Sequence, residues 1–164
     1  MTASPDPPTV RAMTDSASDY MALAFDAAEA AGARGEVPVG AIIVDPVSGE
    51  VLAMAGNETE ARNDPTAHAE MVVIRAAAAK VAATRLAGCD LYVTLEPCAM
   101  CAGAISLARL RRVIYGAYDP KGGGVDHGAR VFSQPTCHHR PEVVGGVAAS
   151  RAETLLKDFF AARR

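Results

Sequence analysis

The sequence predicts a three-layer α/β fold, in which helices cover both faces of a central mixed sheet of five strands. Segments with helical apolar spacing alternate along the chain with short runs rich in β-branched residues. Two of these runs, residues 42–44 and 51–54, flank a cluster of turn residues, as in a β-hairpin. Helices and strands in this order form layered α/β domains. Because the sequence has no internal repeat and no linker, we expect one domain over residues 17–164.

The N-terminal part of the chain predicts a tail followed by a helix. Residues 1–16 are rich in Pro, Thr, Ser and Asp and have no periodic apolar pattern, so we expect a disordered tail there. Ser16 and Ser18 are candidate N-caps for the helix that follows. Its apolar side chains recur at helical spacing until residues 32–35, Gly-Ala-Arg-Gly, end the pattern. These side chains are Tyr20, Leu23, Ala24, Ala27 and Ala31.

A second helix is expected after the hairpin. Asp64, Pro65 and Thr66 are start signals, and good helix formers continue from residue 67 to about residue 83. The remaining elements follow in the order strand, helix, strand, glycine-rich loop, strand and helix. They are expected at residues 89–95, 98–110, 111–118, 119–124, 141–147 and 150–164.

The net charge of −3 hides an asymmetry between two parts of the chain. Residues 1–70 carry 3 basic and 12 acidic side chains, which gives −9. Residues 71–164 carry 13 basic and 7 acidic side chains, which gives +6. A basic second part is suited to a surface that faces phosphate groups, and scattered solvated charges are the alternative explanation.

Cysteine usage and the N-terminal sequence predict the compartment. The first sixteen residues lack the apolar core of a secretory signal, and no segment is long and apolar enough to span a membrane. Four cysteines in such a chain are expected to be reduced thiols and not a disulfide framework. We therefore expect a cytoplasmic protein without a membrane partner.

Cys98 and Cys101 stand three residues apart at the start of a predicted helix, in the stretch Leu-Glu-Pro-Cys-Ala-Met-Cys. At this spacing both sulfurs face the same way, and the N-terminus of a helix favours thiolates. The pair alone is compatible with a redox site of the thioredoxin kind and with two metal ligands. A second motif is needed to decide between them.

His68 and Glu70 supply that second motif, at the start of a different predicted helix. His-x-Glu followed later by Pro-Cys-x-x-Cys matches the signature of the zinc-dependent deaminases. Three protein ligands, His68, Cys98 and Cys101, leave one open position for water on a tetrahedral Zn²⁺, one ion per chain. Zinc lowers the pKa of that water toward about 7, and Glu70 is the candidate that moves protons during the reaction.

The geometry of a helix sets a condition on this motif. Side chains two residues apart on a regular helix diverge by roughly 200°, so His68 and Glu70 converge only if His68 precedes the first helical turn. Cys89 and Cys137 are poorly spaced for a four-ligand structural zinc site. Cys137 with His138 and His139 is an alternative second metal cluster.

Longer stretches in the same order resemble the bacterial tRNA-specific adenosine deaminases, from about Asp19 to the C-terminus. The matching text is Glu-Val-Pro-Val-Gly-Ala at residues 36–41, Asn-Asp-Pro-Thr-Ala-His-Ala-Glu at 63–70, the run from Cys89 to Ala104, and Asp-Phe-Phe-Ala-Ala-Arg-Arg at 158–164. This resemblance implies a homodimer with the cytidine deaminase fold. It also implies hydrolysis of the wobble adenosine to inosine in a tRNA anticodon loop.

The resemblance also implies substrate contacts. By matching motif, Asn57 is expected to hydrogen-bond the flipped base, Ala69 to offer it a backbone amide, and Asp119 to lie close to the target nucleotide. Phe159 and Phe160, with Arg163 and Arg164, resemble the terminal helix that packs around the anticodon loop. Core packing of one of the two phenylalanines is the alternative.

One segment departs from the family pattern. Residues 124–132 read Gly-Val-Asp-His-Gly-Ala-Arg-Val-Phe where a Gly-Ser-Leu-like segment is expected, and this difference concerns the RNA-facing loop and not the zinc site. Deamination of a free nucleobase, guanine or cytosine, is therefore the second hypothesis. A zinc-binding module without activity is a third class, and it would lack Glu70, which is present.

Overall fold

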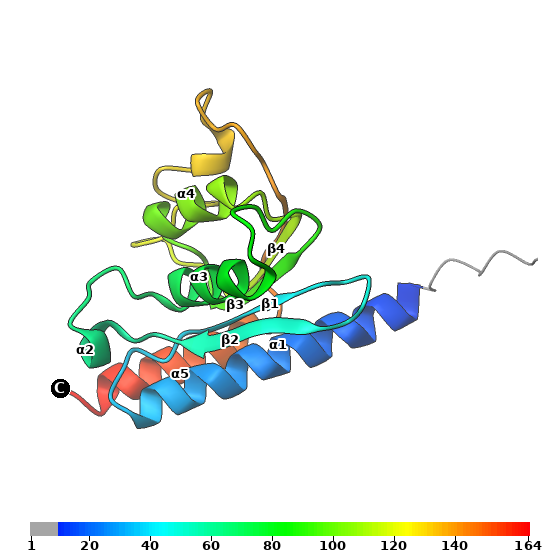
Figure 1. The fold of residues 1–164 in the computed structure, drawn as a ribbon. Coiled ribbons are helices and arrows are strands. Elements are labelled where there is room, and N and C mark those ends of the chain that lie inside the picture. The colour runs from blue at the N-terminus through cyan, green and yellow to red at the C-terminus, as the bar shows by residue number, and fades with distance from the viewer. Residues whose placement is uncertain (1–9) are drawn as a thin grey trace, which may run out of the picture.

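The computed structural model describes the backbone of residues 10–164 and the side chains of residues 17–164. The helices are α1 (Val10–Ala33), α2 (Thr59–Arg62), α3 (Ala69–Val81), α4 (Ala99–Leu107) and α5 (Ala149–Ala161), with a short 3-10 turn η1 (Val131–Ser133). The strands are β1 (Gly40–Val44), β2 (Val51–Gly56), β3 (Asp90–Leu95), β4 (Arg112–Ala117) and β5 (Glu142–Val144). Figure 1 shows their arrangement.

The five strands form one mixed sheet in the order β2-β1-β3-β4-β5. β1 pairs antiparallel with both β2 and β3, whereas β3 pairs parallel with β4, and β4 with β5. The predicted hairpin of β1 and β2 and the predicted five-stranded mixed sheet are therefore confirmed. The helix α4 connects the parallel pair β3 and β4, as parallel neighbours require.

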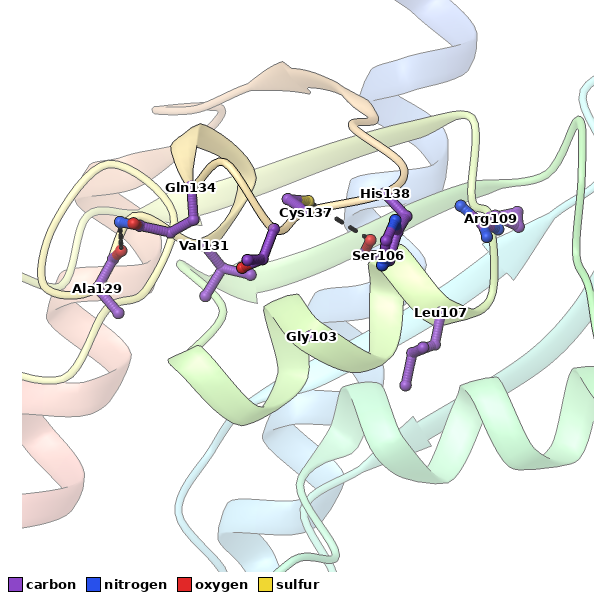
Figure 2. Close-up of a pocket in the computed structure, with 10 residues that line it drawn as sticks. Gly103, Ser106, Leu107, Arg109, Ala129, Val131, Gln134, Cys137 and His138 are labelled. Carbon is purple, nitrogen blue, oxygen red and sulfur yellow. Dashed lines mark hydrogen bonds between the residues drawn. The ribbon is translucent and has the colours of Figure 1, made fainter.

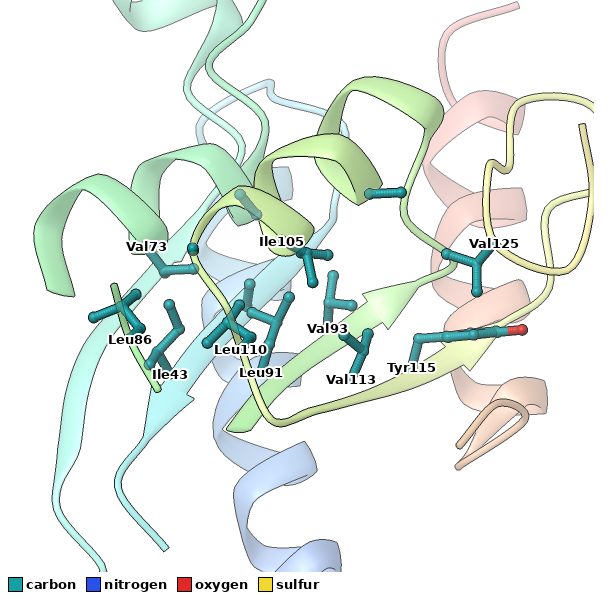
Figure 3. Close-up of a cluster of buried hydrophobic side chains, with 14 of the residues drawn as sticks. Ile43, Val73, Leu86, Leu91, Val93, Ile105, Leu110, Val113, Tyr115 and Val125 are labelled. Atoms are coloured by element: carbon teal, nitrogen blue, oxygen red, sulfur yellow. The ribbon is translucent and has the colours of Figure 1, made fainter. Parts of the chain in front are cut away.

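Helices cover both faces of this sheet, as the sequence predicts (Figure 1). Side chains point alternately to the two faces of a strand. Accordingly Ile43 and Leu91 pack in a cluster with Val73 of α3 and Ile105 of α4, which Figure 3 shows. A second cluster, on the opposite face, contains Ile42, Tyr92 and Ile114 together with residues of α1 and Ala152 of α5.

Glycine allows α1 to lie directly against the hairpin. A Cβ atom on Gly40 would lie 2.0 Å from the carbonyl oxygen of Ala24 and 2.4 Å from the amide nitrogen of Ala28. Any other residue at Gly40 would push α1 away from β1. The alanines on this face of α1 serve the same close approach, since Ala24 and Ala28 are fully buried.

The structure differs from the predicted elements at two helix starts. α1 begins at Val10, so residues 10–16, expected to belong to the tail, are helical, and residues 1–9 lie outside the described residues. Residues 10–16 contain neither Gly nor Pro, so no helix breaker separates them from the predicted helix. α3 begins at Ala69, not at residue 67, because the Asp64 side chain accepts hydrogen bonds from the backbone and hydroxyl of Thr66 and closes a turn before the helix.

Two short elements, α2 and η1, were not expected, because four and three residues carry no measurable apolar period. Among the described residues, no helix has both the length and the apolar character that a membrane span needs.

Candidate metal centre and substrate groove

The candidate metal centre lies where the N-terminal ends of α3 and α4 meet. His68 is the N-cap residue of α3 and Cys98 is the N-cap residue of α4, both with extended backbone angles. Cys101 is the third residue of α4, so its sulfur returns toward the cap position. The required position of His68 before the first helical turn is therefore confirmed. Both helix N-termini also favour negative charge at this point.

The three side chains have the spacing of zinc ligands. The Nδ1 atom of His68 lies 3.6 Å from the sulfur of Cys98 and 3.6 Å from the sulfur of Cys101. Tetrahedral zinc with bonds of about 2.3 Å to sulfur and about 2.05 Å to nitrogen separates such atoms by roughly 3.6 Å. The residues present therefore fit one zinc ion, with Nδ1 as the histidine ligand.

The protonation of these groups points the same way. The hydrogen bond from Cys101 lowers the pKa of Cys98 to about 4, and the same contact, with burial, raises the pKa of Cys101. The hydrogen bond to Cys98 also raises the pKa of His68, against the effect of burial. The site thus concentrates negative charge that shared protons neutralise, and a divalent cation would take their place.

Glu70, on the first turn of α3, is buried beside this group. Burial raises the pKa of Glu70 to about 7, and the charge on Cys98 adds to the rise. The carboxyl also contacts the thiol of Cys101. A carboxyl with a pKa near neutrality is suited to accept and return a proton at physiological pH.

Asn57 and Ala69, both expected to contact a substrate base, contact each other. The amide of Ala69 donates a hydrogen bond of 2.9 Å to Oδ1 of Asn57. This contact satisfies the first amide of α3 and fixes the orientation of the Asn57 carboxamide, with its NH₂ group free to act as a donor.

Two charged residues that the sequence analysis did not single out, Glu36 and Arg34, hold α2 and the backbone at Asn57. Glu36 accepts hydrogen bonds from the amides of Glu60 and Ala61 and from the hydroxyl of Thr59, and so caps α2. The guanidinium of Arg34 donates to the backbone oxygen of Asn57 over 3.4 Å. In the sequence, Arg34 and Glu36 are only two charged residues after the first helix. Their roles depend on contacts with residues more than twenty positions further along the chain.

A groove of about 550 Å³ runs along the C-terminal ends of β3 and β4 and along α5. Asp119 and Phe160, two predicted substrate residues, line it together with Tyr118, Lys121 and Lys157. The Asp119 carboxylate accepts hydrogen bonds from the amides of Lys121 and Gly122, which hold the loop in a turn.

The two phenylalanines of α5 differ in exposure. Phe160 is 48% exposed, and Phe159 is half-buried beneath the guanidinium of Arg163, whose central carbon lies 3.4 Å from the ring centroid. The rings of Phe159 and Phe160 meet edge to face at 5.4 Å. Phe160 is therefore the residue of the pair that is accessible in the groove.

The alternative second metal cluster is not formed. Within residues 17–164, His68, Cys98 and Cys101 are the one group of metal-ligating side chains close enough to share an ion. Cys137 instead contacts the hydroxyl of Ser106 and donates to the carbonyl of His139, while His139 bonds the carbonyl of Leu110 through Nε2. These contacts tie the segment after η1 to α4.

The fold and the ligand set together define a zinc-binding α/β domain, and comparison with known proteins places it more closely. The family model described as the cytidine and deoxycytidylate deaminase zinc-binding region matches residues 14–117. The chain belongs to this deaminase family.

Relatives within the family carry more specific names. A tRNA-specific adenosine deaminase of Agrobacterium fabrum is 55% identical over 145 residues, which is 88% of this chain and 94% of that protein. A solved structure from studies of A-to-I editing by tRNA:A34 deaminases at the wobble position is 56% identical, with a TM-score of 0.82, over 84% of this chain and 99% of that one. A guanine deaminase from Bacillus subtilis is 30% identical, with a TM-score of 0.61, over 88% and 92% of the two chains.

Proposed function

We propose that the protein hydrolyses the wobble adenosine of a tRNA anticodon loop to inosine and ammonia. The observation that carries this proposal is the placement of buried Glu70 beside the zinc ligands. The groove begins at Leu95, three residues before Cys98, and its lining contains two lysines and two carboxylates. The names and sequence identities of the tRNA adenosine deaminases described above support the choice of substrate.

His68, Cys98 and Cys101 would hold the zinc ion, which when bound would acidify a water molecule and so supply the nucleophile. Glu70, buried beside the ligands, would accept one proton from that water and pass it to the ring nitrogen while the water oxygen bonds to the adjacent ring carbon. Glu70 would then move the second proton of the water to the amino group, and the bond between the ring carbon and that nitrogen breaks as ammonia leaves. Glu70 is not a ligand in this scheme, so its role is separable from metal binding.

The base is oriented by groups at the start of α3. Asn57, held by the amide of Ala69 and through its backbone by Arg34, presents its NH₂ group as a donor to the base. The hydrogen bond between Asn57 and Ala69 implies that the Ala69 amide reaches the substrate only if this bond opens. In this structure, the Ala69 amide therefore orients the carboxamide of Asn57.

The groove offers cations and an aromatic ring to the surrounding nucleotides. Lys121 and Lys157 line it and are exposed, as is the ring of Phe160. Bases of single-stranded RNA stack on such rings, and cations near the backbone neutralise phosphates. An anticodon loop is already single-stranded, so extrusion of one base costs little.

Free guanine is the second candidate substrate. The 30% identity to the guanine deaminase favours it among free bases. A free base would use the zinc site and Asn57 but not the lysines of the groove, and this difference separates the two hypotheses.

We further propose that the protein works in the cytoplasm as a homodimer. The apolar surface of α4 supports the dimer, because no residue of this helix is charged while Leu107 is 77% and Met100 37% exposed. A groove of about 530 Å³ lies beside it, between α4 and residues 129–138 (Figure 2). A second copy of the chain would remove this surface from water.

One assay tests the substrate. Zinc-loaded protein is incubated with an anticodon stem-loop carrying a wobble adenosine, with the same stem-loop carrying a wobble cytidine, and with free adenine, guanine and cytosine. We expect inosine from the first RNA and little turnover of the others, because binding energy from the loop contributes to catalysis. Efficient turnover of free guanine, with no inosine in the RNA at low salt, would contradict the proposal. Removal of residues 159–164 should reduce RNA deamination while zinc content stays unchanged.

A further inference from the structure

Glu96, directly before the Pro-Cys-x-x-Cys motif, is a buried carboxylate without a role in the mechanism above. It accepts five hydrogen bonds from one segment: from the amides of Asp119, Val125, Asp126 and His127, and from the His127 ring. The shortest joins His127 Nδ1 to Oε1 at 2.8 Å.

These bonds hold the glycine-rich loop against the start of α4. A Cβ atom on Gly123 would lie 2.1 Å from the Glu96 carboxylate, and one on Gly124 would lie 2.4 Å from the amide nitrogen of Ala99. The amide of Gly124 also donates to the carbonyl of Pro97 over 2.8 Å. The loop therefore rests on the two residues before Cys98 and on the residue after it.

Four of the five hydrogen bonds come from the segment that departs from the family pattern, residues 124–132, and the fifth comes from the amide of Asp119. Val125 packs into the core beside Tyr115 (Figure 3), and the Tyr115 hydroxyl bonds the Asp126 carboxylate. The His127 ring lies edge to face with Tyr118 at 6.1 Å, and Tyr118 lines the substrate groove. His127 is thus linked both to the buried carboxylate and to the groove.

We propose that Glu96 and His127 form a latch that positions the loop of residues 119–124, and with it Asp119 and Lys121, at the groove. They are positioning residues and contact neither zinc nor the reacting atoms. This inference rests on the proposed function, since it assigns the loop to RNA binding. The latch also gives residues 124–132 a role, because the side chain of His127 in this segment bonds Glu96.

The latch predicts a change in KM without an equal change in kcat. Loss of the His127 bond leaves Glu70 and the zinc ligands in place, so the chemical step is preserved. A hydrogen bond to a charged group contributes enough to change an equilibrium by about tenfold or more. We therefore expect KM for the stem-loop to rise about tenfold and kcat to fall less than about threefold.

A matched pair of variants isolates the hydrogen bond. Asn and Leu have the same branched shape, but only Asn places an N–H donor where Nδ1 of His127 lies. His127→Leu should raise KM as above, whereas His127→Asn should stay within about threefold of the wild type. Both should hold one zinc per chain. Equal KM values for the two variants, or zinc loss in His127→Leu, would overturn the latch.

A second measurement needs no substrate and separates this proposal from the proposed function. Amide hydrogen exchange in residues 119–127 of the zinc-loaded protein should speed up in His127→Leu and Glu96→Gln, but not in His127→Asn or in the surface control Glu29→Gln. Unchanged exchange in His127→Leu would refute the latch. A wild-type protein inactive on the stem-loop would instead refute the proposed function and leave this comparison decisive for the latch.

Discussion

At the scale of single residues, Cys98 and Cys101 differ from Cys89 in what surrounds them. Cys98 and Cys101 lie beside His68, whereas half-buried Cys89 packs against the core. We expect Cys101→Ala to lose zinc and activity together, because two ligands hold the ion poorly. Cys89→Ala, the matched control, should retain one zinc per chain by metal analysis. Full zinc occupancy in Cys101→Ala would remove it from the ligand set.

Substitution of Glu70 should affect turnover without affecting zinc content, unlike substitution of a zinc ligand. Glu70→Gln keeps the volume of the side chain and removes the group that moves protons. Turnover of the stem-loop should fall by on the order of 100 to 10,000-fold while zinc content stays at one per chain. A variant with turnover close to that of the wild type would exclude Glu70 from proton transfer.

The site residues that could be predicted from the sequence are those that belong to a local sequence motif. His68, Cys98 and Cys101 form a motif with fixed spacing, and the structure brings them within 4.8 Å of one another. Glu36 and Glu96 were missed because a buried carboxylate is recognised only by its donors. Those of Glu96 lie more than twenty residues further along the chain.

At the scale of elements, helices and strands with a long apolar pattern were predicted, and short elements were not. The longer helices and all five strands were expected near their observed positions, but the starts of α1 and α3 were misplaced. For α3 the reason is that Asp64 forms a local turn that resembles a cap in sequence. The helix α2 has four residues and depends on Glu36 for its N-terminal amides. Its stability is therefore a tertiary property.

The cap of α2 by Glu36 predicts a pH dependence of stability. Burial opposes the charge on Glu36, but bonds from Ala61, Glu60 and Thr59 lower its pKa from the ordinary value of 4.5. A lowered pKa in the folded state adds stability that is present above pH 4.5 and is lost as pH falls through the folded value. Glu36→Gln should cost about 1.5–3 kcal/mol at pH 7.

The direction of this pH dependence can be tested by comparing the wild type with Glu36→Gln at two pH values. Because the advantage of the wild type disappears when Glu36 is protonated, the difference in unfolding free energy between wild type and Glu36→Gln should shrink below pH 4.5. Glu29→Gln, at an exposed ion pair with Arg151, should differ little from the wild type at either pH. Denaturant unfolding at pH 7 and pH 4 measures both. A constant difference would show that the Glu36 charge does not stabilise α2.

At the scale of the whole molecule, the uneven charge bears on RNA binding. The second part of the chain, at +6, contains the lysines of the groove, Arg151 of α5, and Arg163 and Arg164 after α5, while the acidic residues concentrate in the first 70 residues. KM for the stem-loop should therefore rise with salt, with a slope in log units of about 0.7 per neutralised phosphate. Lys157→Ala should reduce this slope, and an unchanged slope would place the phosphates elsewhere.

The proposed dimer accounts for the most exposed apolar residue of α4. Leu107 is 77% exposed on a helix without charges, and Gly103, one turn earlier, has open space where a Cβ atom would lie. In a symmetric dimer this surface would pack against its own copy, and burial of the leucine would stabilise the contact by roughly 1.5–3 kcal/mol per side chain.

A charge at Leu107 should therefore dissociate the dimer. Leu107→Asp would bury two carboxylates in the contact, so the variant is expected to sediment as a monomer at micromolar concentration where the wild type sediments as a dimer. Val47→Asp is the matched control, because Val47 is 95% exposed at the hairpin turn, far along the chain from α4. A dimeric Leu107→Asp would move the contact to another surface, and a monomeric wild type would exclude the dimer itself.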